Sequence, residues 1–175
     1  VLRTLAAVAS SLGRTVHLMA LSGRAARRIT EATGAPASTI AAFLRRLEDP
    51  RTPVGADAMV VIDEASMLEL PTFHRILRRL DGAAVVLVGD PAQLPPIGFG
   101  LTFHAMVGVV PTAMLDQVMR QTEASGIPAV ADAIRNGRMP GLDVFDGTRP
   151  GVSFIPCPAA EIIATIEAVG RRFAA

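Results

Sequence analysis

Two uninterrupted apolar runs constrain the fold of this chain more than any other feature. Residues 58–62 read Ala-Met-Val-Val-Ile, and residues 83–88 read Ala-Ala-Val-Val-Leu-Val. Neither run alternates apolar with polar residues, which is typical of strands in a parallel sheet that helices cover on both faces. A polar break at 48–55 precedes the first run, and a predicted helix at 70–80 separates the two. The pattern predicts a three-layer α/β fold with a parallel sheet flanked by helices and right-handed crossovers.

The segments before the first run continue this alternation. Periodicity and end signals predict a strand at 15–21 and three helices, at 1–12, 22–33 and 38–47. Gly34 follows the second of these helices as a stop, and Ser38 stands at the start of the third as a cap.

The second half of the chain contains a glycine- and proline-rich stretch that we interpret as a linker. We expect a partial motor-type domain over 1–137, a linker or hinge over 138–151 and the start of a further unit over 152–175. Within these bounds the sequence predicts helices at 99–107, 125–136 and 159–173 and short strands at 112–115 and 152–155.

Composition excludes several kinds of chemistry. All seventeen basic residues of the 175 are arginine, so no lysine is present to form a Schiff base or to bind phosphate. One cysteine, Cys157, excludes an internal disulfide and a cysteine-cluster zinc site, and it suits a reducing cytoplasm. The apolar runs are too short to cross a bilayer. The formal net charge of +1 excludes a polybasic tail.

An acidic pair, Asp63-Glu64, directly follows the first apolar run. Parallel sheets bind their ligands where the strands end. One carboxylate there can hold Mg²⁺ beside substrate phosphates, and the second can orient and deprotonate an attacking water. Acidic pairs also occur by chance, as Glu48-Asp49 does in the polar break, but only Asp63-Glu64 follows a buried strand. Alone, the pair indicates a nucleotide hydrolase.

The second apolar run ends in the turn Gly89-Asp90-Pro91-Ala92-Gln93, followed by Leu-Pro-Pro. The amide of Gln93 can bridge a phosphate oxygen and a water, so it is suited to sense a γ-phosphate. Glycine and proline at these positions also build an ordinary turn. The acidic pair is what favours the functional interpretation.

Taken together, Asp63-Glu64-Ala65-Ser66-Met67 and the segment 88–96 resemble motifs II and III of superfamily 1 helicases of the RecD-like group. Three further segments resemble motif Ia (20–26), the next DNA-contacting segment (38–44), and motif IV with the stretch after it (119–137). They occur in the family's order and cover nearly the whole chain. The resemblance implies an incomplete RecA-like P-loop NTPase core.

The resemblance also implies roles for single residues in an ATP site that uses Mg²⁺. Asp63 would help to place Mg²⁺, and Glu64 would act as the catalytic base. Gln93 would couple the γ-phosphate to DNA movement, and Arg120 would contact that phosphate through its permanently charged guanidinium.

For single-stranded DNA, the resemblance implies a second set of residues. Ser22, Gly23 and Arg24 would present backbone N–H groups, a hydroxyl and a charge to a DNA phosphate, and Thr39 would act likewise at the next helix start. The chain has no Trp or Tyr and seven Phe, so base stacking should contribute little and sequence preference should be weak.

One departure from the family is large. The phosphate-binding loop G-x-x-x-x-G-K-[ST] is absent, since the chain has no lysine. We expect the chain to be a fragment that begins just past that loop and is inactive in ATP hydrolysis on its own.

The expected parent is a cytoplasmic, ATP-dependent DNA helicase that moves 5′ to 3′ along single-stranded DNA in repair or recombination. Two alternatives stay open: the helicase portion of a conjugative relaxase, and a nucleotide-independent DNA-binding module. The sequence also leaves open whether the protein works within a larger nuclease or conjugation complex.

Overall fold

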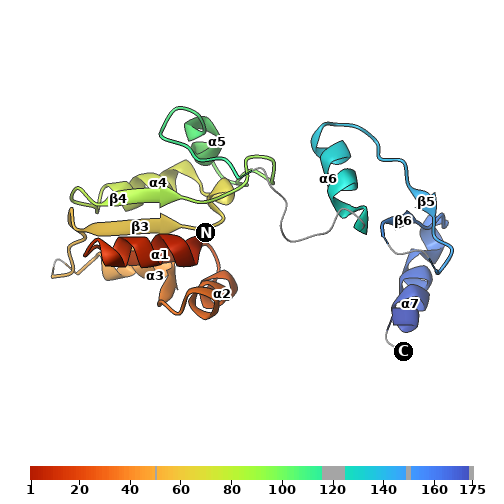
Figure 1. Cartoon of the computed structure of the whole chain (residues 1–175), viewed down its shortest axis with the longest axis horizontal. Helices are drawn as coiled ribbons and strands as arrows, with labels where there is room; N and C mark the ends of the chain where they lie inside the picture. The colour runs from red at the N-terminus through yellow and green to blue at the C-terminus, as the bar shows by residue number, and fades with distance from the viewer. Residues whose placement is uncertain (50, 116–124, 149–150, 174–175) are drawn as a thin grey trace. The chain divides into compact units, whose positions relative to one another are not determined.

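A computed structural model describes residues 1–49, 51–115, 125–148 and 151–173, and the chain divides into two compact units, Val1–Ala113 and Met114–Ala175. In the first unit, four strands form one sheet in the order β2-β1-β3-β4, and every neighbouring pair is parallel. Figure 1 shows β3 and β4 side by side. The strands are β1 (Thr15–Ala20), β2 (Ala37–Thr39), β3 (Ala58–Ile62) and β4 (Ala84–Leu87). The predicted parallel α/β core is confirmed.

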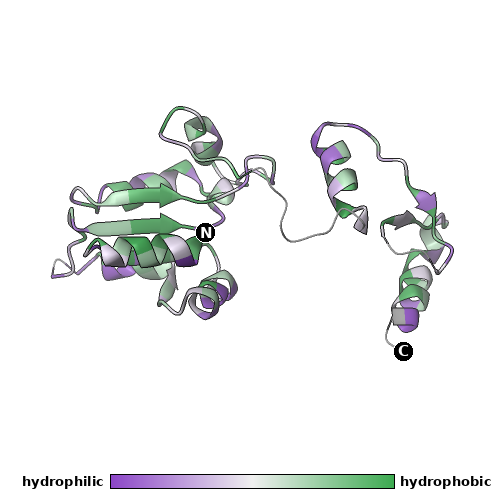
Figure 2. Cartoon of the chain, in the orientation of Figure 1, coloured by the Kyte–Doolittle hydropathy of each residue, from purple (hydrophilic) through white to green (hydrophobic). Residues whose placement is uncertain are grey.

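The described helices of the first unit surround this sheet and are α1 (Leu2–Ser11), α2 (Gly23–Thr33), α3 (Ile40–Arg46), η1 (Ala65–Met67), α4 (Leu70–Leu77) and α5 (Thr102–Met106). Central strand β3 is buried on both of its faces. Val60 and Ile62 belong to a core cluster with side chains of α3, α4 and α5, whereas Val61 packs in a second cluster with α2. Figure 2 shows β3 and β4 in the colours of apolar residues. Burial of the apolar side chains on both faces is the main stabilising term of this fold.

Three local expectations were wrong. Strand β4 is only half-buried along its length, because it lies at the edge of the described sheet. Ser38 does not cap a helix: it pairs with Met19 as part of β2, and Thr39 is the N-cap of α3. Residues 112–115 form no strand. Serine and threonine are both favoured N-cap residues, so the capping preference alone does not choose between Ser38 and Thr39. The pairing of β2 with β1 decides, because it takes Ser38 into the strand.

The second unit contains α6 (Ile127–Arg135), β5 (Asp143–Val144), β6 (Ser153–Phe154), η3 (Ala159–Glu161) and α7 (Ile162–Phe173). Strands β5 and β6 pair in parallel, and the Phe145 N–H donates to the carbonyl of Phe154 (2.9 Å). The stretch expected as a linker therefore contains a strand. The linker and domain assignments stay predictions. None of the helices in the described ranges has the length and apolarity that a membrane span requires.

Candidate nucleotide and nucleic-acid site

The carboxyl ends of the parallel strands meet at one edge of the sheet, and the candidate residues follow those ends. Ala20 of β1 pairs with Thr39 of β2, and Met19 pairs with Ile62 of β3, which in turn pairs with Leu87 of β4. The residues that follow β1, β3 and β4 therefore lie next to one another. The structure thus brings Ser22, Thr39, Asp63, Glu64 and the turn at 89–93 to this edge.

Asp63 continues the ladder of β3, because its N–H donates to the carbonyl of Met19 (2.9 Å). Its carboxyl group is half-buried, and burial raises the pKa of Asp63 above the ordinary value of 3.8, opposed in part by a hydrogen bond from the Glu64 backbone. A carboxylate that is poorly solvated is stabilised by a nearby cation. In its donor chemistry and its position, Asp63 fits a Mg²⁺ ion that keeps water and phosphate oxygens as its other ligands.

The described residues contain no group of three or more His, Cys, Asp or Glu side chains that could hold a metal ion by themselves. A Mg²⁺ ion at Asp63 would therefore take most of its ligands from water and phosphate oxygens.

Glu64 has a different environment from its neighbour. Its side chain is exposed, and its backbone is left-handed, with φ 55° and ψ 37°. Among the described residues it is the only one other than glycine with a positive φ. This conformation costs a residue with a Cβ about 1–2 kcal/mol. The reversal turns the chain so that the Ala65 N–H donates to the carbonyl of Val88 (2.8 Å), while the Glu64 carboxylate stays at the sheet edge.

The turn after Glu64 packs tightly against the segment that follows β4. Val88 donates its N–H to the carbonyl of Ile62 (2.9 Å). A Cβ on Gly89 would lie 2.9 Å from the backbone nitrogen of Ser66 and 3.1 Å from Cζ of Phe103. Only glycine allows this approach. Sequence reasoning missed this role of Gly89, although a glycine directly after a strand was the available signal.

Gln93 lies in an exposed loop that begins at this contact. The Gln93 N–H donates to the carbonyl of Asp90 (3.1 Å), and the Ala92 N–H donates to Oδ1 of Asp90 (2.9 Å). The loop ends against α4, where the Leu70 N–H donates to the carbonyl of Phe99 (2.9 Å). The backbone of 88–90 links Gln93 to the acidic pair, and among the described residues no hydrogen bond joins the Gln93 amide to either carboxylate. Arg120 lies outside the described residues.

Two helix N-termini lie at the same sheet edge as the acidic pair. Ser22 caps α2, where its Oγ accepts from the Ala25 N–H (3.2 Å), and Thr39 caps α3, where its Oγ1 accepts from the Ala42 N–H (3.1 Å). Each hydroxyl retains its own proton for donation to an outside acceptor. The first N–H groups of both helices point out of the helix end, which favours an anion there. Arg24 is exposed in the first turn of α2.

The parallel sheet and the residues at its carboxyl edge define the class of protein. It is a RecA-like α/β core with an acidic pair where the central strand β3 ends. The family model described as "AAA domain" matches residues 1–148, so the chain belongs to the AAA domain family.

Curated relatives agree with the RecD-like resemblance. The chain is 36% identical over 148 residues to the ATP-dependent RecD2 DNA helicase of Deinococcus radiodurans, covering 79% of this chain and 20% of that protein. It is 32% identical to the probable conjugal transfer protein TraA of Sinorhizobium fredii (72% of this chain, 12% of that protein). To the conjugal transfer protein TraA of Agrobacterium fabrum it is 34% identical (59% and 10%). The chain spans a fifth or less of the length of these relatives.

Proposed function

We propose that this chain is the first motor domain of an ATP-driven helicase that translocates along single-stranded DNA. The observation that carries the proposal is the sheet edge, which holds both an acidic pair and two capped helix N-termini. The acidic pair suits the Mg²⁺ ion and the attacking water of a nucleotide site, and the two helix N-termini suit a phosphodiester backbone. The AAA domain match and the similarity to a RecD2 helicase support it.

At the nucleotide side, the exposed Glu64 would accept a proton from the attacking water, and its left-handed backbone would hold the carboxylate at the edge. Asp63 would hold Mg²⁺, which when bound neutralises charge on the phosphate oxygens. Gln93 and Arg120 are proposed to contact the γ-phosphate, as their matches to the family's motifs imply.

At the DNA side, the first turns of α2 and α3 would bind two backbone phosphates through N–H groups, the hydroxyls of Ser22 and Thr39, and the charge of Arg24. The backbone bond between Ala65 and Val88, with Gly89 packed against Ser66, supports a mechanical link between the acidic turn and the Gln93 loop. Movement of one segment would then displace the other.

We further propose 5′ to 3′ movement, a cytoplasmic location and a role in DNA repair or recombination, all on the resemblance to RecD-like helicases. A second candidate, the helicase portion of a conjugative relaxase, is favoured by the similarity to two conjugal transfer proteins. A relaxase domain in the same gene product would decide for this candidate. A nucleotide-independent DNA-binding module is the third.

The test is Glu64→Gln in the full-length gene product. The substitution keeps size and hydrogen bonding but removes the base, so kcat for DNA-stimulated ATP hydrolysis should fall by about 10²–10⁴-fold. Affinity for single-stranded DNA should stay unchanged in a fluorescence anisotropy titration. Glu31→Gln, at an exposed position of α2, is the matched control and should retain full turnover. Normal turnover in the Glu64 variant would remove this residue from the role of base.

A further inference from the structure

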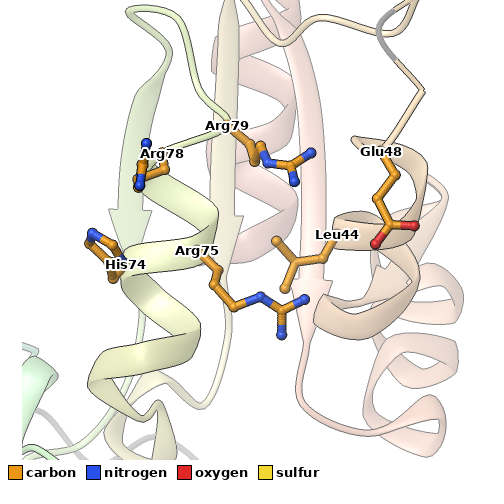
Figure 3. A pocket seen from close by; sticks show the side chains of 6 residues that line it. All are labelled: Leu44, Glu48, His74, Arg75, Arg78 and Arg79. Atoms are coloured by element: carbon orange, nitrogen blue, oxygen red, sulfur yellow. The ribbon is translucent and has the colours of Figure 1, made fainter.

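A groove runs between α3 and α4, and neither Asp63 nor Glu64 lines it. One hollow, about 380 Å³, is lined by Leu44, Glu48, His74, Arg75, Arg78 and Arg79. A second, about 320 Å³, is lined by Leu21, Ile40, Ala41, Leu44, Arg45, Thr72 and Arg75. Leu44 and Arg75 line both hollows, so the two adjoin. Figure 3 shows Arg75 extending from α4, and Arg79 from the segment just after α4, toward Leu44 and Glu48 on the opposite wall.

The lining is strongly cationic. Arg75, Arg78 and Arg79 line the first hollow, and Arg45 and Arg75 line the second, while Glu48 is the single carboxylate among the lining residues of both. Arg79 is committed to the fold, because its guanidinium donates to the carbonyl of Leu47 (2.9 Å). Among the residues that the structure describes, no salt bridge involves Arg45, Arg75 or Arg78. These three exposed guanidinium groups are therefore available to an outside anion.

Arg46, the neighbour of Arg45, contacts side chains of its own unit and is therefore not available to an outside anion. Its guanidinium carbon lies 5.1 Å from the centroid of the Phe43 ring, and its Nη2 is 3.2 Å from Nδ1 of His17. Burial, followed by the charge of Arg46, lowers the pKa of His17, which keeps the ring neutral as a partner for that guanidinium. Arg46 thus stabilises the unit, whereas Arg45 lines the groove.

The groove starts at the two helix N-termini. Leu21 directly precedes the α2 cap Ser22, and Ile40 and Ala41 directly follow the α3 cap Thr39. From there the lining follows α3 and α4 to Glu48 and Arg79, beyond their last turns. The seven residues of α3 span roughly 10 Å, long enough for about two adjacent backbone phosphates of one strand.

We propose that this groove binds phosphates of the same DNA strand that the two helix N-termini hold, through Arg45, Arg75 and Arg78. The inference rests on the proposed DNA-binding function and extends its site along α3 and α4. Arginine suits this ligand because its fork matches phosphate oxygens. Continuity with the helix N-termini favours a nucleic-acid strand over an acidic peptide as the occupant.

The experiment titrates the 175-residue chain with fluorescent oligothymidylates of 4 and 20 nucleotides by anisotropy, over a series of salt concentrations. Arg75→Ala combined with Arg78→Ala should weaken binding of the 20-mer about tenfold at low salt. The slope of log affinity against log salt should fall by about 1.4, near 0.7 for each lost phosphate contact. Binding of the 4-mer, which is long enough only for the helix N-termini, should change less than twofold.

Two controls make the result specific. Arg138→Ala combined with Arg171→Ala removes the same charge from positions paired with Asp132 and Glu167, and it should leave both oligonucleotides bound as before. Arg75→Lys combined with Arg78→Lys keeps the charge but loses the guanidinium fork, so it should recover part of the 20-mer affinity and the salt slope of the wild type. Circular dichroism of each variant confirms that the fold is retained.

Failure of DNA binding in the groove can be distinguished from failure of DNA binding by the whole chain. Unchanged 20-mer binding in the Arg75/Arg78 double variant, with wild-type binding intact, overturns the groove and leaves the helix N-termini as the DNA site. A wild-type chain that binds neither oligonucleotide overturns both the groove and the DNA part of the proposed function. Polyglutamate that binds the wild type and is lost in the double variant, while the 20-mer stays bound, would make the groove a protein-docking surface and overturn the proposal.

Discussion

Asp63 and Glu64 are adjacent carboxylates with different environments. Asp63 is half-buried in the continuation of β3, with a raised pKa, whereas Glu64 is exposed at a left-handed turn. Such a separation of environments is how two neighbouring acids take different tasks. The less solvated group is suited to a cation, and the exposed group is suited to exchange a proton with water.

Asp63→Asn should make the protein more stable while disabling it. Because the pKa of Asp63 is raised on folding, the folded protein binds that proton more tightly than the unfolded chain. The free energy of unfolding therefore falls over the pH range between 3.8 and the raised pKa of the folded protein, and it stays lower at neutral pH. Asp63→Asn removes this penalty, so Tm at pH 7 without Mg²⁺ should rise by a few degrees.

The increase in Tm should vanish below pH 3.8, where Asp63 is protonated in both states. Thermal denaturation at pH 7 and at pH 3 measures both limits. The increase should be small, because the group is only half-buried and water screens its charge. Asp81→Asn, at an exposed position, should not shift Tm. A lower Tm for Asp63→Asn at pH 7 would show that the ionised carboxylate stabilises the fold.

The sequence could place the acidic pair but not its geometry. An apolar run that ends in Asp-Glu is visible in the printed residues, and so is its position after a buried strand. The left-handed backbone of Glu64 and the contact between Gly89 and Ser66 are not. Both accompany a hydrogen bond between Ala65 and Val88, which are 23 positions apart, and no local pattern encodes such a pairing.

At the scale of elements, Ser22 and Thr39 have two tasks that can be separated. Ser22→Ala and Thr39→Ala each remove a helix cap and should each cost about 1 kcal/mol of stability. Glycine at an N-cap costs only a few tenths of a kcal/mol relative to serine, yet it too lacks the hydroxyl. If the hydroxyls bind DNA, Ser22→Gly should weaken oligonucleotide binding with little loss of stability.

Urea denaturation and anisotropy on the same samples measure these two effects. Ser11→Gly, at the end of α1, is a control that removes an exposed hydroxyl elsewhere. DNA affinity that follows stability across Ser22→Ala and Ser22→Gly would show that the hydroxyl acts only as a cap.

Elements with strong local signals were predicted closely, and those held by tertiary contacts were not. Helix α2 begins after Ser22 and ends before Gly34, as its end signals indicate. Strand β2 has three residues, Ala37–Thr39, with no apolar run, and it exists because β1 offers its edge. The strand predicted at 112–115 does not form, because a short apolar segment without a neighbouring strand has no partner for backbone hydrogen bonds.

At the scale of the molecule, the fold class followed from the order of strands and helices, because right-handed crossovers leave few ways to arrange them. The strand order β2-β1-β3-β4 places the acidic turn between the helix N-termini and the Gln93 loop. The division of the second half could not be predicted in the same way. Strand β6 lies within the strand predicted at 152–155, whereas β5 has two residues, too few for a periodic signal, in a stretch predicted as a linker.

The absence of lysine sets the last prediction. In P-loop proteins a lysine reaches the β- and γ-phosphates and stabilises the charge that develops during hydrolysis. None of the 175 residues can supply that amine. The purified chain should therefore bind ATP weakly and show no DNA-stimulated phosphate release, while it still binds single-stranded DNA. A coupled phosphate assay with and without oligothymidylate measures this, with the full-length gene product as the positive control. Turnover by the isolated chain that is lost in its Glu64→Gln variant would contradict this prediction, because it would show hydrolysis at this site without a lysine.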